Sequence, residues 1–199
     1  MIAILDYGAG NLQSVQNTLA VIGCEYTLVR DTNGLRQAAK IILPGVGHFG
    51  QMMRALDAMD VRQALLDRIR AGAPFLGICL GMQALFESSE EAPEVHGLAL
   101  YPGRVVRFPA EARVPHMGWN ELSPRPEAKL MRHLPPRPFV YFAHSYYVPA
   151  NDRAAATCTY TLPYTAALES ANVFGVQFHP EKSAAIGQRI VRNFLEAEC

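Results

Sequence analysis

The sequence is poor in cysteine, and its cysteines are never close together. Cys24, Cys79, Cys158 and Cys199 are its four thiols, and no two of them form a C-x-x-C pair. This spacing argues against a zinc site, and in a chain of 199 residues it also argues against a disulfide framework. Each thiol therefore needs an explanation of its own.

The sequence also has no excess of charge of either sign. Lys and Arg together number 18, as do Asp and Glu, so the formal net charge is zero. No overall field draws such a protein toward nucleic acid or an anionic membrane. We expect no nucleic-acid partner, and a small neutral molecule or another protein as the binding partner.

Long apolar runs are a third absence. The first ten residues, MIAILDYGAG, have no basic region ahead of their short apolar stretch, and no run elsewhere reaches membrane-spanning length. We expect a soluble, cytoplasmic protein without a membrane partner. A chain of this length fits one domain, residues 1–199, that buries about 70% of the surface exposed when unfolded.

Short β-branched runs alternate with amphipathic segments in the first half of the chain. This pattern predicts an α/β fold, with a mostly parallel central sheet and helices on both faces. The expected strands are 2–5, 26–29, 40–43 (ended by Pro44) and 75–78, and the expected helices are 12–22 and one capped by Asp60 and stopped by Gly72 and Pro74. Beyond residue 100 we expect a mixed or antiparallel extension, with strands at 104–108, 139–148, 155–160, 165–169 and 173–178, and a final helix at 184–197.

The stretch Gly77-Ile78-Cys79-Leu80-Gly81 joins an expected strand to a helix-like segment. It is the cysteine form of the nucleophile elbow, G-x-S-x-G, which exposes a nucleophile at the carboxyl end of a sheet. The N–H of Leu80 can then point at a developing oxyanion, and a helix N-terminus favours the Cys79 thiolate. The alternative is a buried cysteine packed between glycines.

A base for this thiol is offered by the stretch GVQFHPEKS, residues 175–183. Pro180 disfavours a helical conformation at His179, and an extended chain would place His179 and Glu181 on the same side. The carboxylate could then hold one imidazole nitrogen while the other faces the thiol. The alternative is an exposed histidine at a strand end, near a solvated glutamate.

Two glycine-rich segments follow expected strands. In LPGVGHFG, residues 43–50, the backbone around Gly45, Val46 and Gly47 could supply a second oxyanion donor. The Gly-Lys-Ser/Thr ending of a phosphate-binding loop is absent, and YGAGNL (7–12) lacks the full G-x-G-x-x-G of a dinucleotide site. The histidines show no metal-ligand spacing, so we expect no cofactor and no metal.

GICLGMQ with a distant QFHPE resembles the class I, triad-type glutamine amidotransferases, whose fold is flavodoxin-like. DYGAGNL, PGVGHF, PHMGWN, HSYY and HPEKS resemble, within that family, the glutaminase subunits of imidazole glycerol phosphate synthase. The resemblance implies that a cysteine attacks the side-chain amide of L-glutamine, releases ammonia and leaves a glutamyl thioester. It further implies a heterodimer with a separate (β/α)8-barrel cyclase subunit, which uses the ammonia in histidine biosynthesis.

The resemblance also implies roles for individual residues. Cys79 would be the nucleophile, His179 the general base and then acid, and Glu181 its orienter. The oxyanion and substrate residues would be Val46, Gly47 and Leu80, through their backbone, with Gln83, Ser145 and Tyr146 at glutamine's amino-acid end. The residues at or near the cyclase would be Asn11, Trp119, Tyr141 and Lys182. Trp119 and Tyr141 could instead be core aromatics, and Lys182 a solvated charge. A cysteine peptidase and a non-catalytic subunit are the rival functions.

Overall fold

A central sheet organises the structure, a computed structural model that describes residues 1–197. Its parallel part has the order β2-β1-β3-β4-β13. These strands are β1 (Ile2–Leu5), β2 (Tyr26–Val29), β3 (Lys40–Gly45), β4 (Phe75–Cys79) and β13 (Val173–Val176). Parallel neighbours bring the carboxyl ends of β3 and β4 to one edge, where ligands of open α/β sheets bind.

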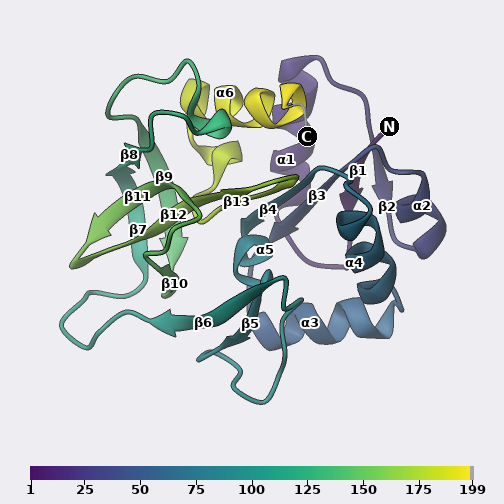
Figure 1. The fold of residues 1–199 in the computed structure, drawn as a ribbon, viewed down its shortest axis with the longest axis horizontal. Coiled ribbons are helices and arrows are strands. Elements are labelled where there is room, and N and C mark those ends of the chain that lie inside the picture. The colour runs from purple at the N-terminus through teal and green to yellow at the C-terminus, as the bar shows by residue number, and fades with distance from the viewer. Residues whose placement is uncertain (198–199) are drawn as a thin grey trace.

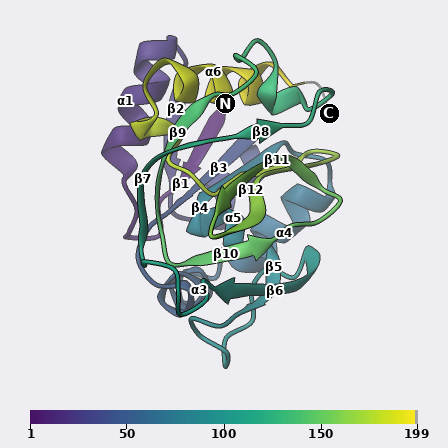
Figure 2. The same cartoon turned by 90° about the vertical axis from the view of Figure 1, so that its left-hand side faces the viewer.

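Antiparallel pairing extends the sheet beyond β13, except that β5 and β6 run parallel. The added strands are β12 (Leu162–Ser170), β10 (Tyr146–Pro149), β6 (Tyr101–Arg107) and β5 (Phe86–Ser89), with β11 (Ala154–Tyr160) and β8 (Ser123–Pro124) branching from β12. A separate antiparallel ribbon joins β7 (His116–Glu121) to β9 (Phe139–His144), side by side in Figure 2.

Helices cover both faces of the parallel strands (Figure 1). They are α1 (Leu12–Ile22), α2 (Thr32–Gln37), α3 (Phe49–Ala58), α4 (Arg62–Arg70), α5 (Leu80–Gln83) and α6 (Ala184–Glu196), with 3-10 turns η1 (Lys129–Met131) and η2 (Pro180–Lys182). Ile4 and Ile42 share one core with α1 and α6, whereas Leu5 and Leu43 share the other with α2, α3 and α4. This alternation is the two-residue period of a strand covered on both sides, and it confirms the predicted fold class.

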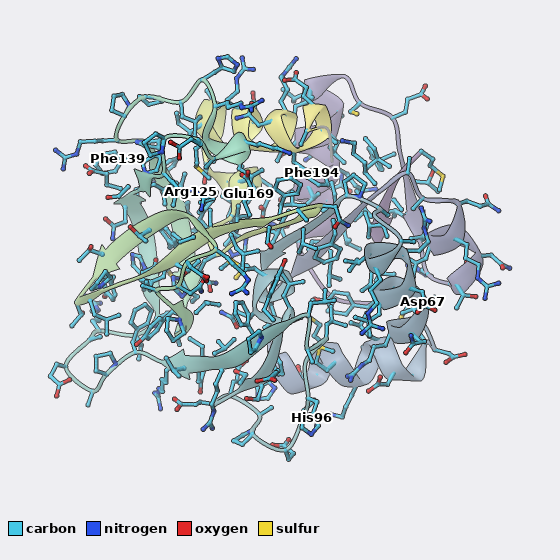
Figure 3. The ribbon with its side chains drawn as sticks, in the orientation of Figure 1. Asp67, His96, Arg125, Phe139, Glu169 and Phe194 are labelled. Carbon is cyan, nitrogen blue, oxygen red and sulfur yellow. The ribbon has the colours of Figure 1, made fainter. Side chains whose placement is uncertain are left out.

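Burial separates the core from the periphery. Phe194 of α6 lies fully buried beneath its helix, whereas Phe139 at the start of β9 is 51% exposed (Figure 3).

Among residues 1–197, no helix is both long and apolar enough to cross a membrane. The thiol of Cys199, which we expected to be exposed, lies outside the described residues.

Several predicted boundaries are wrong. Strand β3 continues through Pro44, because beyond Ile42 it pairs with β4 but no longer with β1, and a proline is tolerated where a strand has one neighbour. Asp60 does not cap α4; it has a left-handed φ of 54°, and the helix begins after Val61. The expected strand 139–148 is interrupted at Ser145, where the chain leaves the ribbon and enters the main sheet.

Candidate active site

The turn from β4 into α5 places Cys79 at the carboxyl edge of the sheet. Cys79 has φ 54° and ψ −107°, a conformation that costs about 1–3 kcal/mol in a non-glycine residue. Its side chain is buried. Strand β3 lies alongside, because Gly45 pairs with Cys79 in the sheet. The strand–turn–helix context of a nucleophile elbow is therefore present, although α5 is only four residues long.

Glycines make this turn possible because the backbone segments around it nearly touch. A Cβ on Gly77 would lie 2.4 Å from the Gly81 carbonyl oxygen, and one on Gly81 would lie 2.1 Å from the Leu43 oxygen. On β3, a Cβ at Gly45 would lie 2.6 Å from the Gly81 nitrogen. The three glycines thus let β3, β4 and α5 pack backbone to backbone under Cys79.

His179 and Glu181 form a buried pair next to this turn. His179 Nδ1 lies 2.8 Å from Glu181 Oε1, and both side chains are at most 3% exposed, so the alternative of an exposed histidine is wrong. His179 is extended, as expected before Pro180, and its N–H donates to the Tyr141 carbonyl at 2.9 Å. Glu181 instead lies in the 3-10 turn η2, so a tight turn and not a two-residue period brings the pair together.

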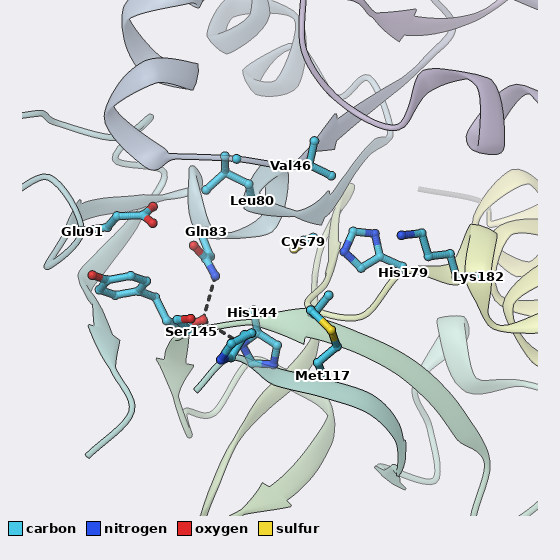
Figure 4. A pocket seen from close by; sticks show the side chains of 14 residues that line it. Val46, Cys79, Leu80, Gln83, Glu91, Met117, His144, Ser145, His179 and Lys182 are labelled. Carbon is cyan, nitrogen blue, oxygen red and sulfur yellow. Dashed lines mark hydrogen bonds between the residues drawn. The ribbon is translucent and has the colours of Figure 1, made fainter. Parts of the chain in front are cut away.

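The charge on His179 is set by its neighbours. Burial would lower the pKa of His179, but hydrogen bonding to Cys79 and to Glu181 outweighs burial and raises this pKa from 6.5 to about 10. With Nδ1 held by Glu181, the ring's other nitrogen, Nε2, is left for Cys79, which lies beside the ring in Figure 4. At neutral pH the His179 ring is therefore a protonated imidazolium.

This charge state predicts how the histidine titrates. In Cys79→Ala the strongest upward influence on the pKa of His179 is gone while burial remains, so the ring should lose its proton at a lower pH than in wild type. NMR of the imidazole resonances against pH measures this shift. Cys158→Ala is the matched control, because Cys158 is also buried but its hydrogen-bond partner is Tyr164. An unchanged titration in Cys79→Ala would mean that the thiol does not hold the His179 proton.

A cavity of about 330 Å³ opens at Cys79 and His179 (Figure 4). Every residue predicted for the oxyanion or substrate site lines it, namely Val46, Gly47, Leu80, Gln83, Ser145 and Tyr146. Sequence reasoning missed four other lining residues: Glu91, Pro115, Met117 and Ala143. His144 also lines the cavity. Glu91 is held in place because its Oε2 accepts the Phe49 N–H at 2.7 Å. The acidic run after the elbow helix, ESSEE, was the signal that could have found it.

The residues predicted at the partner interface gather around η2. Asn11 Nδ2 lies 3.5 Å from Glu181 Oε1, and Lys182 Nζ lies 5.6 Å from the centre of the Tyr141 ring. The Trp119 and Tyr141 rings meet edge-on at 6.3 Å. Trp119 is 54% exposed, so the alternative of a core aromatic is wrong for it, while Tyr141 is half-buried. The predicted interface therefore borders the His179–Glu181 pair.

Two further histidines, His116 and His144, are buried. Burial lowers the pKa of His144 and that of His116, to about 4 for His116, so both rings are neutral. His144 Nδ1 donates to the Tyr146 carbonyl at 2.8 Å, and His48 Nδ1 accepts the Gly50 N–H at the start of α3. In the described part of the chain, no three His, Cys, Asp or Glu side chains are grouped so that they could hold a metal ion.

Comparisons with known proteins agree with this geometry. Residues 3–197 match the family described as glutamine amidotransferase class-I. "Imidazole glycerol phosphate synthase subunit HisH" from Methanothermobacter thermautotrophicus is 48% identical, covering 98% of both chains, and a protein of the same name from Desulfitobacterium hafniense is 45% identical, covering 98% of this chain and 93% of its own. Two solved structures share the fold, each with 19% identity and a TM-score of 0.76. One is a glutamine amidotransferase, and the match covers 98% of this chain and 97% of that one. The other is PurLQS from Thermotoga maritima, and the match covers 98% of this chain and 96% of that one. The sequence match over nearly the whole chain confirms the resemblance drawn from the motifs, and this chain belongs to the class I glutamine amidotransferases.

Proposed function

We propose that this chain is the glutaminase subunit of an imidazole glycerol phosphate synthase. It hydrolyses L-glutamine to glutamate and ammonia and delivers the ammonia to a cyclase subunit in histidine biosynthesis. The observation that carries this proposal is the buried Cys79–His179–Glu181 arrangement beside a cavity. The 48% identity to an imidazole glycerol phosphate synthase subunit HisH supports it. A thiol nucleophile also suits a reducing compartment such as the cytoplasm.

The first half-reaction forms a thioester. The Cys79 thiolate adds to the carboxamide carbon of glutamine, and the carbonyl oxygen becomes an oxyanion near the backbone of Leu80 and of the Val46–Gly47 segment. His179 starts protonated, so it acts first as the acid and only later as the base, the reverse of the order expected from the resemblance. It gives its proton to the departing nitrogen. The C–N bond breaks, ammonia leaves, and a glutamyl thioester remains on Cys79.

The second half-reaction restores the enzyme. His179 is now neutral and takes a proton from water as the water attacks the thioester carbonyl. Collapse of the second tetrahedral intermediate breaks the C–S bond, which frees glutamate and returns the thiolate beside the imidazolium. Glu181 holds the ring through Nδ1 at 2.8 Å in both steps, so that Nε2 always faces the reacting atoms.

The far end of the cavity suits the amino-acid end of glutamine. The Glu91 carboxylate lines it opposite Cys79 and can pair with the substrate's α-ammonium group (Figure 4). Gln83, Ser145 and Tyr146 surround the same end.

The proposed partner is a (β/α)8-barrel cyclase, which would dock on the surface formed by Asn11, Trp119, Tyr141 and Lys182. Support comes from exposure, since Trp119 is 54% and Met117 63% exposed, and large apolar side chains gathered on one surface mark protein interfaces. Asn11 contacts Glu181 directly, so docking would act on the orienter of the catalytic histidine.

The function predicts that glutamine hydrolysis depends on the partner. The isolated chain should release ammonia from glutamine slowly, and addition of the cyclase with its nucleotide substrate should accelerate release, because docking and catalysis share η2. The coupling free energy between two linked binding sites is typically about 1–3 kcal/mol, although the effect on a reaction rate can lie outside that range. Lys182→Ala and Asn11→Ala should weaken this stimulation more than they change thermal unfolding.

The assay measures ammonia release with and without cyclase and nucleotide, for wild type and both variants. Glu25→Ala, on the loop between α1 and β2, serves as a surface control outside the proposed interface. Full activity in the isolated chain, or wild-type stimulation of both variants, would contradict the coupling. Cleavage of peptides instead of free glutamine would favour the rival cysteine peptidase.

A further inference from the structure

Gln177 is a buried glutamine that touches the sulfur of Cys79. Its side chain is fully buried, and Nε2 lies 3.6 Å from Cys79 Sγ. Its position follows from the sheet. Strand β13 ends at Val176, which pairs with Ile78, so the residues that follow them, Gln177 and Cys79, lie side by side. The main-chain N–H of Gln177 donates to the Ala166 carbonyl at 2.8 Å and holds the residue to β12.

A chain of hydrogen bonds determines which end of the Gln177 amide faces the sulfur. The Tyr146 carbonyl can only accept, so the Gln83 atom 2.9 Å away is the donor Nε2 (dashed in Figure 4). The same Nε2 lies 3.0 Å from Gln177, which must therefore present its acceptor Oε1. The Gln177 amide is thus oriented with its N–H group toward Cys79.

From this chain of contacts we infer that Gln177 is a catalytic residue: its amide N–H donates to the Cys79 sulfur and stabilises the thiolate over the thiol. A side-chain amide suits this position because it donates without titrating, so it does not compete with His179 for the proton. A hydrogen bond to a buried charged group is stronger than one between neutral groups. The inference rests on the proposed function, since it takes Cys79 as the nucleophile.

The same contacts link the substrate pocket to the nucleophile. Both hydrogens of the Gln83 amide nitrogen are used, one toward Tyr146 and one toward Gln177, which leaves Gln83 Oε1 as an acceptor in the cavity. An N–H group of bound glutamine can occupy that acceptor. Gln83 thereby contacts the substrate and orients Gln177 at the same time.

Alkylation of Cys79 by iodoacetamide tests the inference without glutamine. The rate is measured from about pH 5 to about pH 9, and the modified peptide is identified by mass spectrometry because Cys24 and Cys158 are also free thiols. Gln177→Leu keeps much of the side-chain volume but removes the donor, so alkylation at neutral pH should slow about 10-fold or more and the profile should move to higher pH. Gln177→Glu places a second negative charge beside the sulfur and should move the profile further.

Two further variants keep the test decisive. Gln37→Glu, at the exposed end of α2, makes the same chemical exchange away from the site and should leave the profile unchanged. Gln177→Met replaces Gln177→Leu if the branched side chain prevents folding. A wild-type alkylation profile in a folded leucine or methionine variant would reduce Gln177 to a packing residue and overturn the inference. If the profile shifts as expected while the wild-type complex fails to hydrolyse glutamine, the inference stands and the proposed function falls.

Discussion

Cys79→Ala should abolish glutamine-dependent synthesis by the complex, by about 10⁴-fold or more, while synthesis from added ammonia stays close to wild type. Under the proposed function, only the generation of ammonia needs the thiolate, because the cyclase chemistry would take place on another chain. Alanine also fits the site, because it removes one buried sulfur and leaves the backbone of the elbow unchanged.

The measurement compares the two nitrogen sources for the same preparation of the complex. Cys158→Ala is the control for loss of a buried thiol, since Cys158 is 1% exposed and lies outside the cavity. Equal loss of both activities in Cys79→Ala would mean that Cys79 maintains the structure and is not a nucleophile.

Gly81→Ala should have the largest effect on folding. The added methyl group would lie 2.1 Å from the Leu43 carbonyl oxygen, and neither the β3 backbone nor the elbow can move without breaking the sheet register. We expect a loss of more than about 4 kcal/mol in the free energy of unfolding, or no folded protein at all.

Gly23→Ala is the matched comparison. Gly23 ends α1 with φ 80°, but its Cβ would meet nothing within 4 Å, so the cost is the left-handed conformation alone, about 1–2 kcal/mol. Denaturant unfolding of both variants separates the cost of the steric clash at Gly81 from the cost of a left-handed backbone conformation, which is the only cost at Gly23. Similar losses for the two would show that the elbow tolerates a side chain at Gly81.

The features predicted best from the sequence depend on short stretches of chain. The elbow is specified by five consecutive residues, and the parallel strands by apolar runs buried on both faces.

The helix α3 was not predicted, although the sequence contains a signal for it: Phe49, Met52, Met53 and Leu56 follow a helical period and are all buried. The glycines just before it and at its second position favoured a loop interpretation and concealed it.

The features that were missed depend on contacts between distant segments. Glu91 reaches the cavity because its carboxylate accepts a hydrogen bond from the N–H of Phe49, 42 residues away. Gln177 lies within QFHPE, yet its contact with Cys79 exists only once β13 pairs with β4. The pairing of His179 with Glu181 was predicted on the assumption of an extended chain, whereas the 3-10 turn of η2 produces it.

Trp119 gives the chain a built-in optical reporter. It is the single tryptophan in the sequence, it stands half in solvent on the β7–β9 ribbon, and its ring lies edge-on to that of Tyr141. Indole emission moves to shorter wavelength when the ring leaves water, and no second indole is present to mask the change. Docking of a partner on this surface can therefore be followed in the unlabelled protein, through a ring that contacts Tyr141.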